Sequence, residues 1–460
     1  MDIFDLSSLI KRKEISPIDL VKEKLKIIEE KNSDINAFIT VTAEEALNKA
    51  RVLEEELQKG LYRGLLHGIP IAIKDLIYTK GIPTTSGSKI YRNFIPSEDA
   101  TVIKKLKKEG AIILGKLNTH EFAYGPMGDR SYFGPCRNPH NLDRIAGGSS
   151  SGSGASVASN MVLASLGTDT GGSVRIPASA CGVVGMKPTF GLISKSGVFS
   201  LAHTLDHIGL VTRSVRDNAA LLNVVVGYDS KDPHSKKLKN IPNYVKGSLQ
   251  SIDEVKIGVA TNTYFTDVEI EVEKTIDKTI NVLKELGASI IEVEVPNIEE
   301  IAEAQSLTIK AEAVANHIEG LDSIYLGNID EEVYQRLQDS KKVTGYEYVE
   351  AQMKRSKFIS TLNKLFDKID VLVVPTLPII PTKINQRQVK LNDSTVSVRD
   401  ALLKLTSPFN YTGNPAISIP GGISTTGLPI GVQLIGRHYE EKKLYQVGYH
   451  VEQYLLNQKI

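Results

Sequence analysis

The chain has 460 residues, and its 55 lysines and arginines nearly balance 54 aspartates and glutamates, for a formal net charge of +1. A hydrophobic share of 41% and a charged share of 24% are typical of a globular protein and exclude a disordered chain or a coiled coil. This balance argues against a nucleic-acid or membrane surface as the main ligand. The sequence has two cysteines, no signal-peptide pattern and no apolar run near the ~18 residues of a membrane span. We therefore expect a cytoplasmic protein without direct nucleic-acid or membrane contacts.

The first part of the chain carries helix signals. Ser16 followed by Pro17 is typical of a helix N-cap with proline at the first helical position. Thr42 and Glu45 have the spacing of a capping box that would open a second helix. These signals predict a helical segment over about residues 1–65 that packs on the rest of the protein.

Strand-like and helix-like segments then alternate along the chain. The expected strands are residues 68–77, 111–115, 255–260, 289–295 and 370–375, and an antiparallel pair at 416–420 and 431–435. The expected helices are residues 99–109, 270–286 and 348–367 and the C-terminal segment. This alternation predicts one large α/β sheet with helices on both faces. The lysine-rich stretch 229–253 is expected to be a solvated surface loop.

Residues 144–173 have a composition found nowhere else in the chain. Glycine and serine make up half of this stretch, and Asp169 is the only charged residue between Arg144 and Arg175. A serine-glycine linker would be polar throughout, whereas this stretch contains the apolar run 161–164. The composition therefore predicts packed structure.

Metal and cofactor motifs are missing. The sequence has no His-Glu-x-x-His and no paired Cys-x-x-Cys, so we expect no metal site and no cofactor. The segment from Gly147 to Gly154 superficially resembles a phosphate-binding loop, although it lacks the Gly-Lys-Ser/Thr ending. A phosphate- or nucleotide-binding protein is therefore an alternative to an enzyme of the kind described below.

Lys74 is a cation inside an apolar strand. Lysine is almost never fully buried without a partner, so one interpretation is a strand-end residue or an ion pair with a carboxylate. The other interpretation is that desolvation lowers the pKa of Lys74 and makes it a neutral base near pH 7.

Two glycine-rich segments offer the remaining parts of an active site. Four serines fall within positions 149–153, more than a plain turn explains. Gly171 and Gly172 precede Ser173, and consecutive backbone N–H groups there can converge on one point, as in an oxyanion hole. No histidine lies near either segment in the sequence. A desolvated lysine, relayed through a second serine, is then the chemically sensible base for a serine nucleophile.

This pattern resembles the amidase signature family of enzymes. The resemblance is carried by the block from Gly147 through Pro188 and by the segments 68–75, 117–123 and 205–209, so it covers essentially the whole chain. It implies an α/β fold with a mixed, twisted central sheet covered by helices on both faces. It also implies that residues 1–460 form a single amidase domain.

The resemblance further implies the roles of individual residues. Ser173 would be the nucleophile, Lys74 the base, and Ser149 the relay serine, held in a cis peptide with Gly148. The backbone N–H groups of an oxyanion hole would come from Thr170, Gly171, Gly172 and Ser173. The residues expected around the triad are Ser150, Thr168, Asp169 and Arg175, with Asp169 and Arg175 paired.

Two enzymatic functions follow from the resemblance. The first is an amide hydrolase that acts alone and converts a small-molecule carboxamide into an acid and ammonia through an acyl-enzyme, with a homodimer left open. The second is the glutaminase subunit of the tRNA-dependent glutamyl/aspartyl-tRNA amidotransferase, which would require partner subunits.

Two positions bear on the choice between these functions. The glutaminase subunit places an arginine for the glutamine carboxylate on the helix before a Val-Val-Pro strand, and Arg355 has this position. It also places an aspartate for the α-amino group five residues before a Pro-x-Asn segment. Leu403 has that register here, and Asp400 lies three residues away. Leucine favours an apolar substrate over free glutamine, whereas a small insertion would let Asp400 serve instead.

Overall fold

The computed structural model describes residues 1–321 and 323–458, and its central feature is an 11-stranded sheet. The strands follow the order β1-β3-β2-β6-β8-β7-β14-β15-β11-β9-β10. Their bounds are β1 Phe38–Val41, β2 Pro70–Lys74, β3 Ile112–Leu117, β6 Ala164–Asp169, β7 Val184–Lys187, β8 His207–Thr212, β9 Lys256–Ala260, β10 Ser289–Val293, β11 Val371–Pro375, β14 Ala416–Ile423 and β15 Pro429–Gly436. Two small hairpins lie outside this sheet: β4 Arg137–Asn138 with β5 Asn141–Ile145, and β12 Gln388–Leu391 with β13 Ser394–Ser397.

The sheet is mixed, as expected. β2 pairs in parallel with β3 and β6, and β9 pairs in parallel with β10 and β11. The strands from β6 to β11 in the sheet order are antiparallel neighbours, and they include the predicted pair β14 and β15. The antiparallel centre thus joins two parallel flanks.

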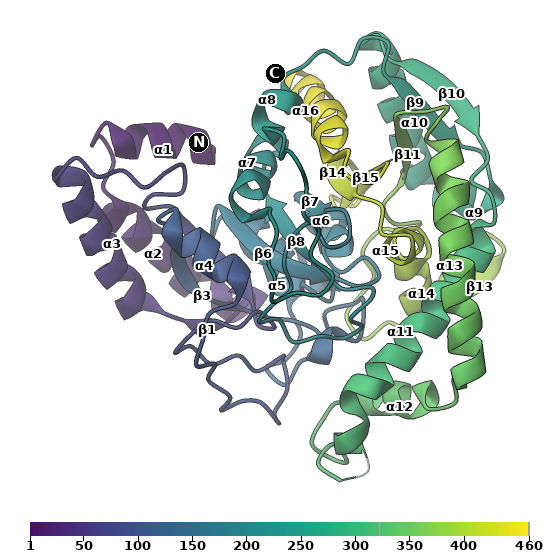
Figure 1. The fold of residues 1–460 in the computed structure, drawn as a ribbon, viewed down its shortest axis with the longest axis horizontal. Coiled ribbons are helices and arrows are strands. Elements are labelled where there is room, and N and C mark those ends of the chain that lie inside the picture. The colour runs from purple at the N-terminus through teal and green to yellow at the C-terminus, as the bar shows by residue number, and fades with distance from the viewer. Residues whose placement is uncertain (322, 459–460) are drawn as a thin grey trace.

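Helices lie on both faces of the sheet (Figure 1). In β2, Ile71 and Ile73 pack into one hydrophobic cluster and Ala72 into another, because successive side chains of a strand point to opposite faces. The helix bounds are α1 Ile3–Lys11, α2 Pro17–Ile35, α3 Ala43–Gln58, α4 Thr101–Lys108, α5 Ser151–Ala158, α6 Arg175–Cys181, α7 Val215–Val225, α8 Tyr244–Ser248, α9 Thr263–Thr266, α10 Ile270–Glu285, α11 Ile298–Leu321, α12 Glu331–Ser340, α13 Gly345–Leu365, α14 Val398–Lys404, α15 Pro408–Tyr411 and α16 Glu441–Asn457, with a 3-10 turn at Glu121–Ala123.

The N-terminal helices confirm one predicted cap and contradict the other. The Ser16 hydroxyl accepts hydrogen bonds from the N–H groups of Ile18 and Asp19 at the start of α2. Thr42 stands at the N-cap of α3 but makes no capping bond, because its hydroxyl donates to the Ile113 carbonyl in β3 at 3.0 Å. The predicted capping box is therefore wrong, and Thr42 fastens the helix to the sheet instead.

The glycine- and serine-rich stretch is packed, as predicted. It forms α5 and β6, and both elements are buried along almost their whole length. Gly152 in α5 lies so close to the backbone of Ala37 and Asn118 that a Cβ there would collide with both. The small residues therefore let a helix approach the sheet at backbone distance.

The stretch 229–253 is less solvated than expected. It contains the short helix α8, in which Tyr244 is only 1% exposed and packs against Tyr445 of α16, with ring centroids 6.0 Å apart. Lys236, Lys237 and Lys239 lie in the irregular part before this helix. The stretch is thus a loop that one buried tyrosine anchors to the C-terminal helix.

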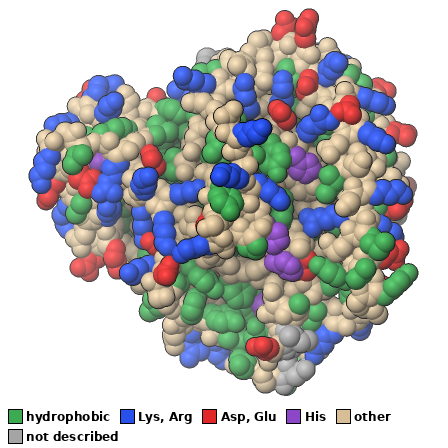
Figure 2. Space-filling view, viewed as in Figure 1, with side chains coloured by type: hydrophobic (Ala, Val, Ile, Leu, Met, Phe, Trp, Pro, Cys, Tyr) green, Lys and Arg blue, Asp and Glu red, His purple; other side chains and the backbone are tan. Residues whose placement is uncertain are grey.

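The surface agrees with the balanced composition. Figure 2 shows lysine and arginine side chains intermingled with aspartate and glutamate over one face of the molecule. Among the residues that the structure describes, no helix is long and apolar enough to cross a bilayer.

Candidate active site

Lys74 lies at the end of β2 with no exposed surface. Its Nζ donates to Ser149 Oγ and to Thr168 Oγ1, each at 2.8 Å. Within the described chain it forms no ion pair with a carboxylate, which contradicts the ion-pair interpretation. Burial lowers the pKa of Lys74 well below its ordinary value, although the charges of Asp169 and Asp206 oppose the shift. The amine is therefore desolvated and aimed at a serine hydroxyl.

The two serine segments lie against each other at this lysine. The Gly148–Ser149 peptide bond is cis, as expected. The Ser150 N–H donates to the Ser173 carbonyl at 3.2 Å, and the Ser150 hydroxyl donates to the Thr168 carbonyl at 3.0 Å. Between the hydroxyls of Ser149 and Ser173 the described structure contains no hydrogen bond. Lys74 is thus hydrogen-bonded directly to Ser149, and the Ser173 backbone is hydrogen-bonded to the adjacent Ser150.

The loop from Thr170 to Ser173 presents backbone N–H groups. The Gly172 N–H donates to Asp169 Oδ1 at 2.8 Å. This N–H group is therefore not free to form part of the expected oxyanion hole. The N–H groups of Thr170, Gly171 and Ser173 have no acceptor within the described residues. Gly172 has a φ of +134°, and a Cβ there would collide with the Thr406 side chain, so the loop requires glycine at this position. Three N–H groups of this loop are thus free donors within the described residues.

Asp169 and Arg175 support the loop from Thr170 to Ser173, and both are fully buried. Arg175 Nε and Nη2 donate to the two carboxylate oxygens of Asp169 at 3.0 and 2.9 Å, which confirms the predicted pair. The Val174 N–H adds a further bond to Asp169 at 3.1 Å. Burial raises the pKa of Asp169, but the Arg175 charge and the hydrogen bonds outweigh it and keep the pKa below its usual range. The carboxylate therefore stays ionised and fixes the backbone before Ser173.

Three buried residues at the site were missed by the sequence analysis. Asn410 of α15 donates to Asp169 Oδ1 at 2.8 Å. Asp206 accepts a bond from Thr170 Oγ1 at 2.6 Å, and His207 contacts the Asp169 carbonyl through Nδ1 at 3.2 Å. Asp206 and His207 belong to a segment already noted for the family resemblance, which was the available signal. Asn410 is the asparagine of the Pro-x-Asn segment that set the register of Leu403, but its contact with Asp169 depends on the fold.

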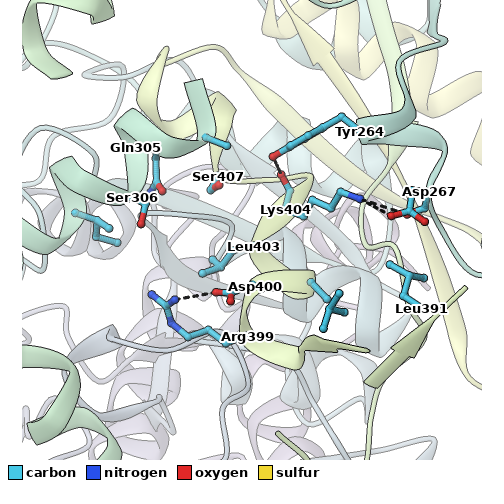
Figure 3. Close-up of a pocket in the computed structure, with 14 residues that line it drawn as sticks. Tyr264, Asp267, Gln305, Ser306, Leu391, Arg399, Asp400, Leu403, Lys404 and Ser407 are labelled. Carbon is cyan, nitrogen blue, oxygen red and sulfur yellow. Dashed lines mark hydrogen bonds and ion pairs between the residues drawn. The ribbon is translucent and has the colours of Figure 1, made fainter. Parts of the chain in front are cut away.

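A cavity of about 360 Å³ lies beside Gly171. A Cβ at Gly171 would lie 3.1 Å from Leu403, 3.5 Å from Gln305 and 3.8 Å from Ser407, and all three side chains line the cavity (Figure 3). Neither Ser149 nor Ser173 is among its lining residues. The cavity runs between α11 and α14.

The side chains at positions 400 and 403 differ in placement. Leu403 points into the cavity next to Gly171, as Figure 3 shows. Asp400 also lines the cavity, but its side chain is 68% exposed and pairs with Arg399 at 3.0 Å. The side chain next to Gly171 is thus apolar, and the Asp400 carboxylate lies at the rim of the cavity.

Arg355 is not among the residues that line this cavity. Its Nε donates to the Tyr411 carbonyl at 2.6 Å, and its Nη2 donates to the Thr204 carbonyl at 2.8 Å. The guanidinium thus holds two backbone segments together. A role in substrate binding stays a prediction.

Glu121 is a buried carboxyl next to the site that gives a testable pH dependence. Its side chain is 2% exposed, and its Oε2 accepts the Asp330 N–H at 2.7 Å. Burial raises the pKa of Glu121 from 4.5 to about 7. The folded state therefore binds this proton more tightly than the unfolded state, so stability falls as pH rises from 4.5 to 7.

Replacing Glu121 by glutamine is expected to remove this pH-dependent loss of stability. Urea unfolding should show the variant gaining up to about 3 kcal/mol relative to the parent between pH 5 and pH 8, at 1.36 kcal/mol per pKa unit. Glu55→Gln, at an exposed position of α3, is the control and should show no such gain. Equal pH slopes for the parent and Glu121→Gln would show that Glu121 ionises normally.

In the described chain no group of three histidine, cysteine, aspartate or glutamate side chains is arranged to hold a metal ion. The described residues of this site supply a desolvated amine, two serine hydroxyls and free backbone N–H donors.

Comparison with known proteins places these features in a family. The Amidase family matches residues 19–445. One of the subunits of the glutamyl-tRNA(Gln) amidotransferase from Thermoanaerobacter pseudethanolicus is 39% identical over 476 residues, which cover 98% of this chain and 96% of that protein.

Solved structures agree over the full length. A structure from a vestigial protein complex, linked to the evolutionary origins of an s-triazine catabolic enzyme, superposes with a TM-score of 0.94 at 32% identity and covers 98% of both chains. A bacterial aryl acylamidase of the amidase signature family superposes with a TM-score of 0.89 at 28% identity, over 98% of this chain and 96% of that one.

Proposed function

Because this chain belongs to the amidase signature family of amide-bond hydrolases, we propose that it hydrolyses a carboxamide to a carboxylic acid and ammonia through an acyl-enzyme on Ser173. One observation carries the proposal. A fully buried Lys74 has its Nζ 2.8 Å from Ser149 Oγ and has no carboxylate partner among the described residues. A desolvated lysine of this kind is a base suited to neutral pH. Family membership leaves no support for the alternative of a phosphate- or nucleotide-binding protein.

Acylation uses the three residues in sequence. Neutral Lys74 takes the proton of Ser149, and Ser149 takes the proton of Ser173. Ser173 Oγ then attacks the amide carbonyl carbon. The oxygen that becomes negative is stabilised by the free N–H groups of Thr170, Gly171 and Ser173. The proton returns from Lys74 through Ser149 to the amide nitrogen, and the C–N bond breaks with release of ammonia.

Deacylation uses the same groups in reverse. A water molecule gives a proton to the relay and attacks the ester carbon, and the same N–H groups stabilise the second tetrahedral intermediate. Collapse of this intermediate releases the acid and returns a proton to Ser173. The cycle needs no cofactor, since every proton moves between side chains of the chain, the substrate and water.

The direct test is ammonia release from aliphatic, aromatic and glutamine amides by the purified chain. Activity on at least one amide, with no activity in Ser173→Ala, supports the proposal. A purified, folded chain that hydrolyses none of them would contradict it.

We propose further that the chain acts alone as a single amidase domain and that free glutamine is not its preferred substrate. Leu403 lies 3.1 Å from the position that a Cβ at Gly171 would take, and leucine offers no partner for an α-ammonium group. An ammonium that leaves water without an acceptor is costly, so free glutamine should bind poorly.

Replacing Leu403 by aspartate is expected to raise kcat/KM for glutamine by about tenfold or more and to lower it for neutral aliphatic amides. The measurement is the ratio of the two kcat/KM values in the parent and the variant. Asp400→Asn tests the alternative register: a selective loss of glutamine activity would show that Asp400 binds the ammonium. A parent enzyme that prefers glutamine over simple amides would contradict the proposal that the chain acts alone.

The glutaminase-subunit function is the second candidate. It is favoured by the identity of 39% to a glutamyl-tRNA(Gln) amidotransferase chain. Under this function the chain would bind partner subunits, and its ammonia would pass to them. Co-purification of the chain from its native cell extract distinguishes the two candidates.

A further inference from the structure

The three free N–H groups of the loop from Thr170 to Ser173 belong to three different peptide planes. The peptide bonds of this loop are trans. In a planar trans peptide, the N–H of one residue points opposite to the carbonyl of the residue before it. The groups that bind the carbonyl oxygens of Asp169, Thr170 and Gly172 therefore also set the directions of the three free N–H groups.

The Asp169 carbonyl is bound by two buried side chains from distant segments. Asn410 Nδ2 in α15 donates to this oxygen at 2.9 Å, and His207 Nδ1 at the start of β8 lies 3.2 Å from it. Asn410 Nδ2 also donates to the Asp169 carboxylate at 2.8 Å, so one amide group holds both the backbone and the side chain of this residue. The peptide plane that carries the Thr170 N–H is thus held by two side chains.

The other two peptide planes are held differently. The Gly172 carbonyl accepts the Ile176 N–H at 2.7 Å, so the backbone of α6 positions the Ser173 N–H. Gln305 Nε2 lies 3.5 Å from the Thr170 carbonyl, which is long for a hydrogen bond. The Thr170 N–H is therefore the free donor whose direction depends most on side chains.

The partners of the His207 ring determine which nitrogen carries the hydrogen. Nδ1 lies 2.6 Å from the Leu205 carbonyl and 3.2 Å from the Asp169 carbonyl. A carbonyl oxygen can only accept, so Nδ1 is the donor and Nε2 is an acceptor. Lys187 Nζ lies 3.3 Å from Nε2 and offers it a hydrogen. The ring is thus held on both sides, with its N–H group shared between two carbonyl oxygens.

Lys187 is fixed in turn by the main chain. It is fully buried, and its Nζ donates to the Asn414 carbonyl at 2.5 Å and to the Pro188 carbonyl at 3.3 Å. Burial, and then the Lys187 charge, lower the pKa of His207 well below its ordinary value. The His207 ring therefore stays neutral at pH 7 and keeps its hydrogen on Nδ1.

We propose that His207 and Asn410 are positioning residues that direct the Thr170 N–H toward the oxyanion of the reaction. The inference rests on the proposed function, because this N–H takes part only when Ser173 attacks a carbonyl carbon. Loss of one oxyanion donor costs about 10²–10³-fold in kcat. A donor that is present but misdirected should cost part of this factor.

Two substitutions of His207 separate its hydrogen bond from its bulk. His207→Phe keeps a ring and removes both nitrogens, whereas His207→Asn places an amide N–H near the position of Nδ1. We expect His207→Phe to lower kcat by about 10- to 100-fold with KM changed by less than about threefold, and His207→Asn to recover most of this loss. Asn410→Ala should lower kcat in the same way.

His67→Phe is the matched control. His67 is also fully buried, and its Nε2 lies 3.0 Å from the carbonyl of Leu53 in α3. Its replacement removes the same kind of contact without touching the loop from Thr170 to Ser173, so kcat and KM should stay at the parent values.

Labelling of Ser173 by a fluorophosphonate separates this inference from the proposed function. The phosphoryl oxygen of the reagent needs the same N–H groups, but no amide has to be cleaved. With the reagent in excess, unfolded protein lowers the labelled fraction and leaves the first-order rate constant of the folded protein unchanged. We expect this rate constant to fall by about tenfold or more in His207→Phe and Asn410→Ala and to recover in His207→Asn.

The outcomes distinguish the two proposals. Labelling that depends on His207 and Asn410, in a chain that cleaves no amide, would overturn the proposed function alone. Parent values of kcat and of the labelling rate in both His207→Phe and Asn410→Ala would overturn the positioning role. A change in KM alone, or a loss that His207→Asn shares in full, would also overturn it.

Discussion

Ser173→Ala is expected to reduce kcat/KM for amide hydrolysis by about 10⁴-fold or more, since it removes the atom that attacks the carbonyl. The three free N–H groups and the cavity would remain, and they account for the small activity that survives. Incubation of the parent with a fluorophosphonate, followed by peptide mass spectrometry, should place the adduct on Ser173.

Ser153→Ala is the matched control for this substitution. Ser153 lies in the same glycine- and serine-rich stretch and is also fully buried, but its hydroxyl donates to the Leu166 carbonyl at 3.1 Å. Its loss should affect stability and leave the labelling of Ser173 intact. An adduct on Ser149 in the parent would contradict the assignment of Ser173 as the nucleophile.

Lys74→Ala is expected to lower kcat/KM by about 10²–10⁴-fold, the range for loss of a general base. Since burial lowers the pKa of Lys74 well below its ordinary value, the neutral amine forms as pH rises through that lowered pKa. Activity of the parent should therefore rise with pH along an acid limb and then level off. The variant should lose this limb, and Lys74→Arg should be inactive because its guanidinium stays charged. A variant that keeps the parent pH profile would make Lys74 a structural residue.

Stability provides a second measurement for the same residue. The unfolded chain holds the Lys74 proton at neutral pH, whereas the folded state disfavours it, so this lysine destabilises the fold. Lys74→Met should therefore raise the free energy of unfolding at pH 7. Lys116→Met is the matched control, because Lys116 is equally buried but lies 3.3 Å from Asp75. Its removal leaves a buried carboxylate unpaired and should lower the free energy of unfolding.

The local sequence determined the elements whose signals do not depend on distant residues. Ser16 and Pro17 cap α2 as predicted, because cap and partner lie within three residues. The capping box at Thr42 failed because a strand 71 residues away offers its hydroxyl an acceptor. A capping box at Thr344 and Glu347, which the sequence analysis did not identify, opens α13 three residues before the predicted start. Sequence spacing cannot distinguish the two cases, since the competing acceptor is brought in by the fold.

Two helices, one of which lines the cavity, were also not predicted. α11 and α12 carry Gln305 and Arg336, yet neither helix was identified from the sequence. Their apolar residues pack against each other: Ile301 and Ala304 of α11 lie in the same cluster as Val333 of α12. Helices that bury their apolar faces against each other are stabilised by tertiary packing, and the sequence of one segment alone does not indicate this packing.

The sequence by itself determined the type of chemistry. A lysine inside an apolar strand, an excess of serines between glycines, and two glycines before a serine indicated a serine nucleophile with a lysine base. The family resemblance then implied the roles of Lys74, Ser149 and Ser173. Only the tertiary structure decided which atoms meet. The 2.8 Å contact between Lys74 and Ser149 joins residues 75 positions apart. Residue types and their spacing can be read along the chain. Distances between atoms and the desolvation of side chains arise only when remote segments pack together.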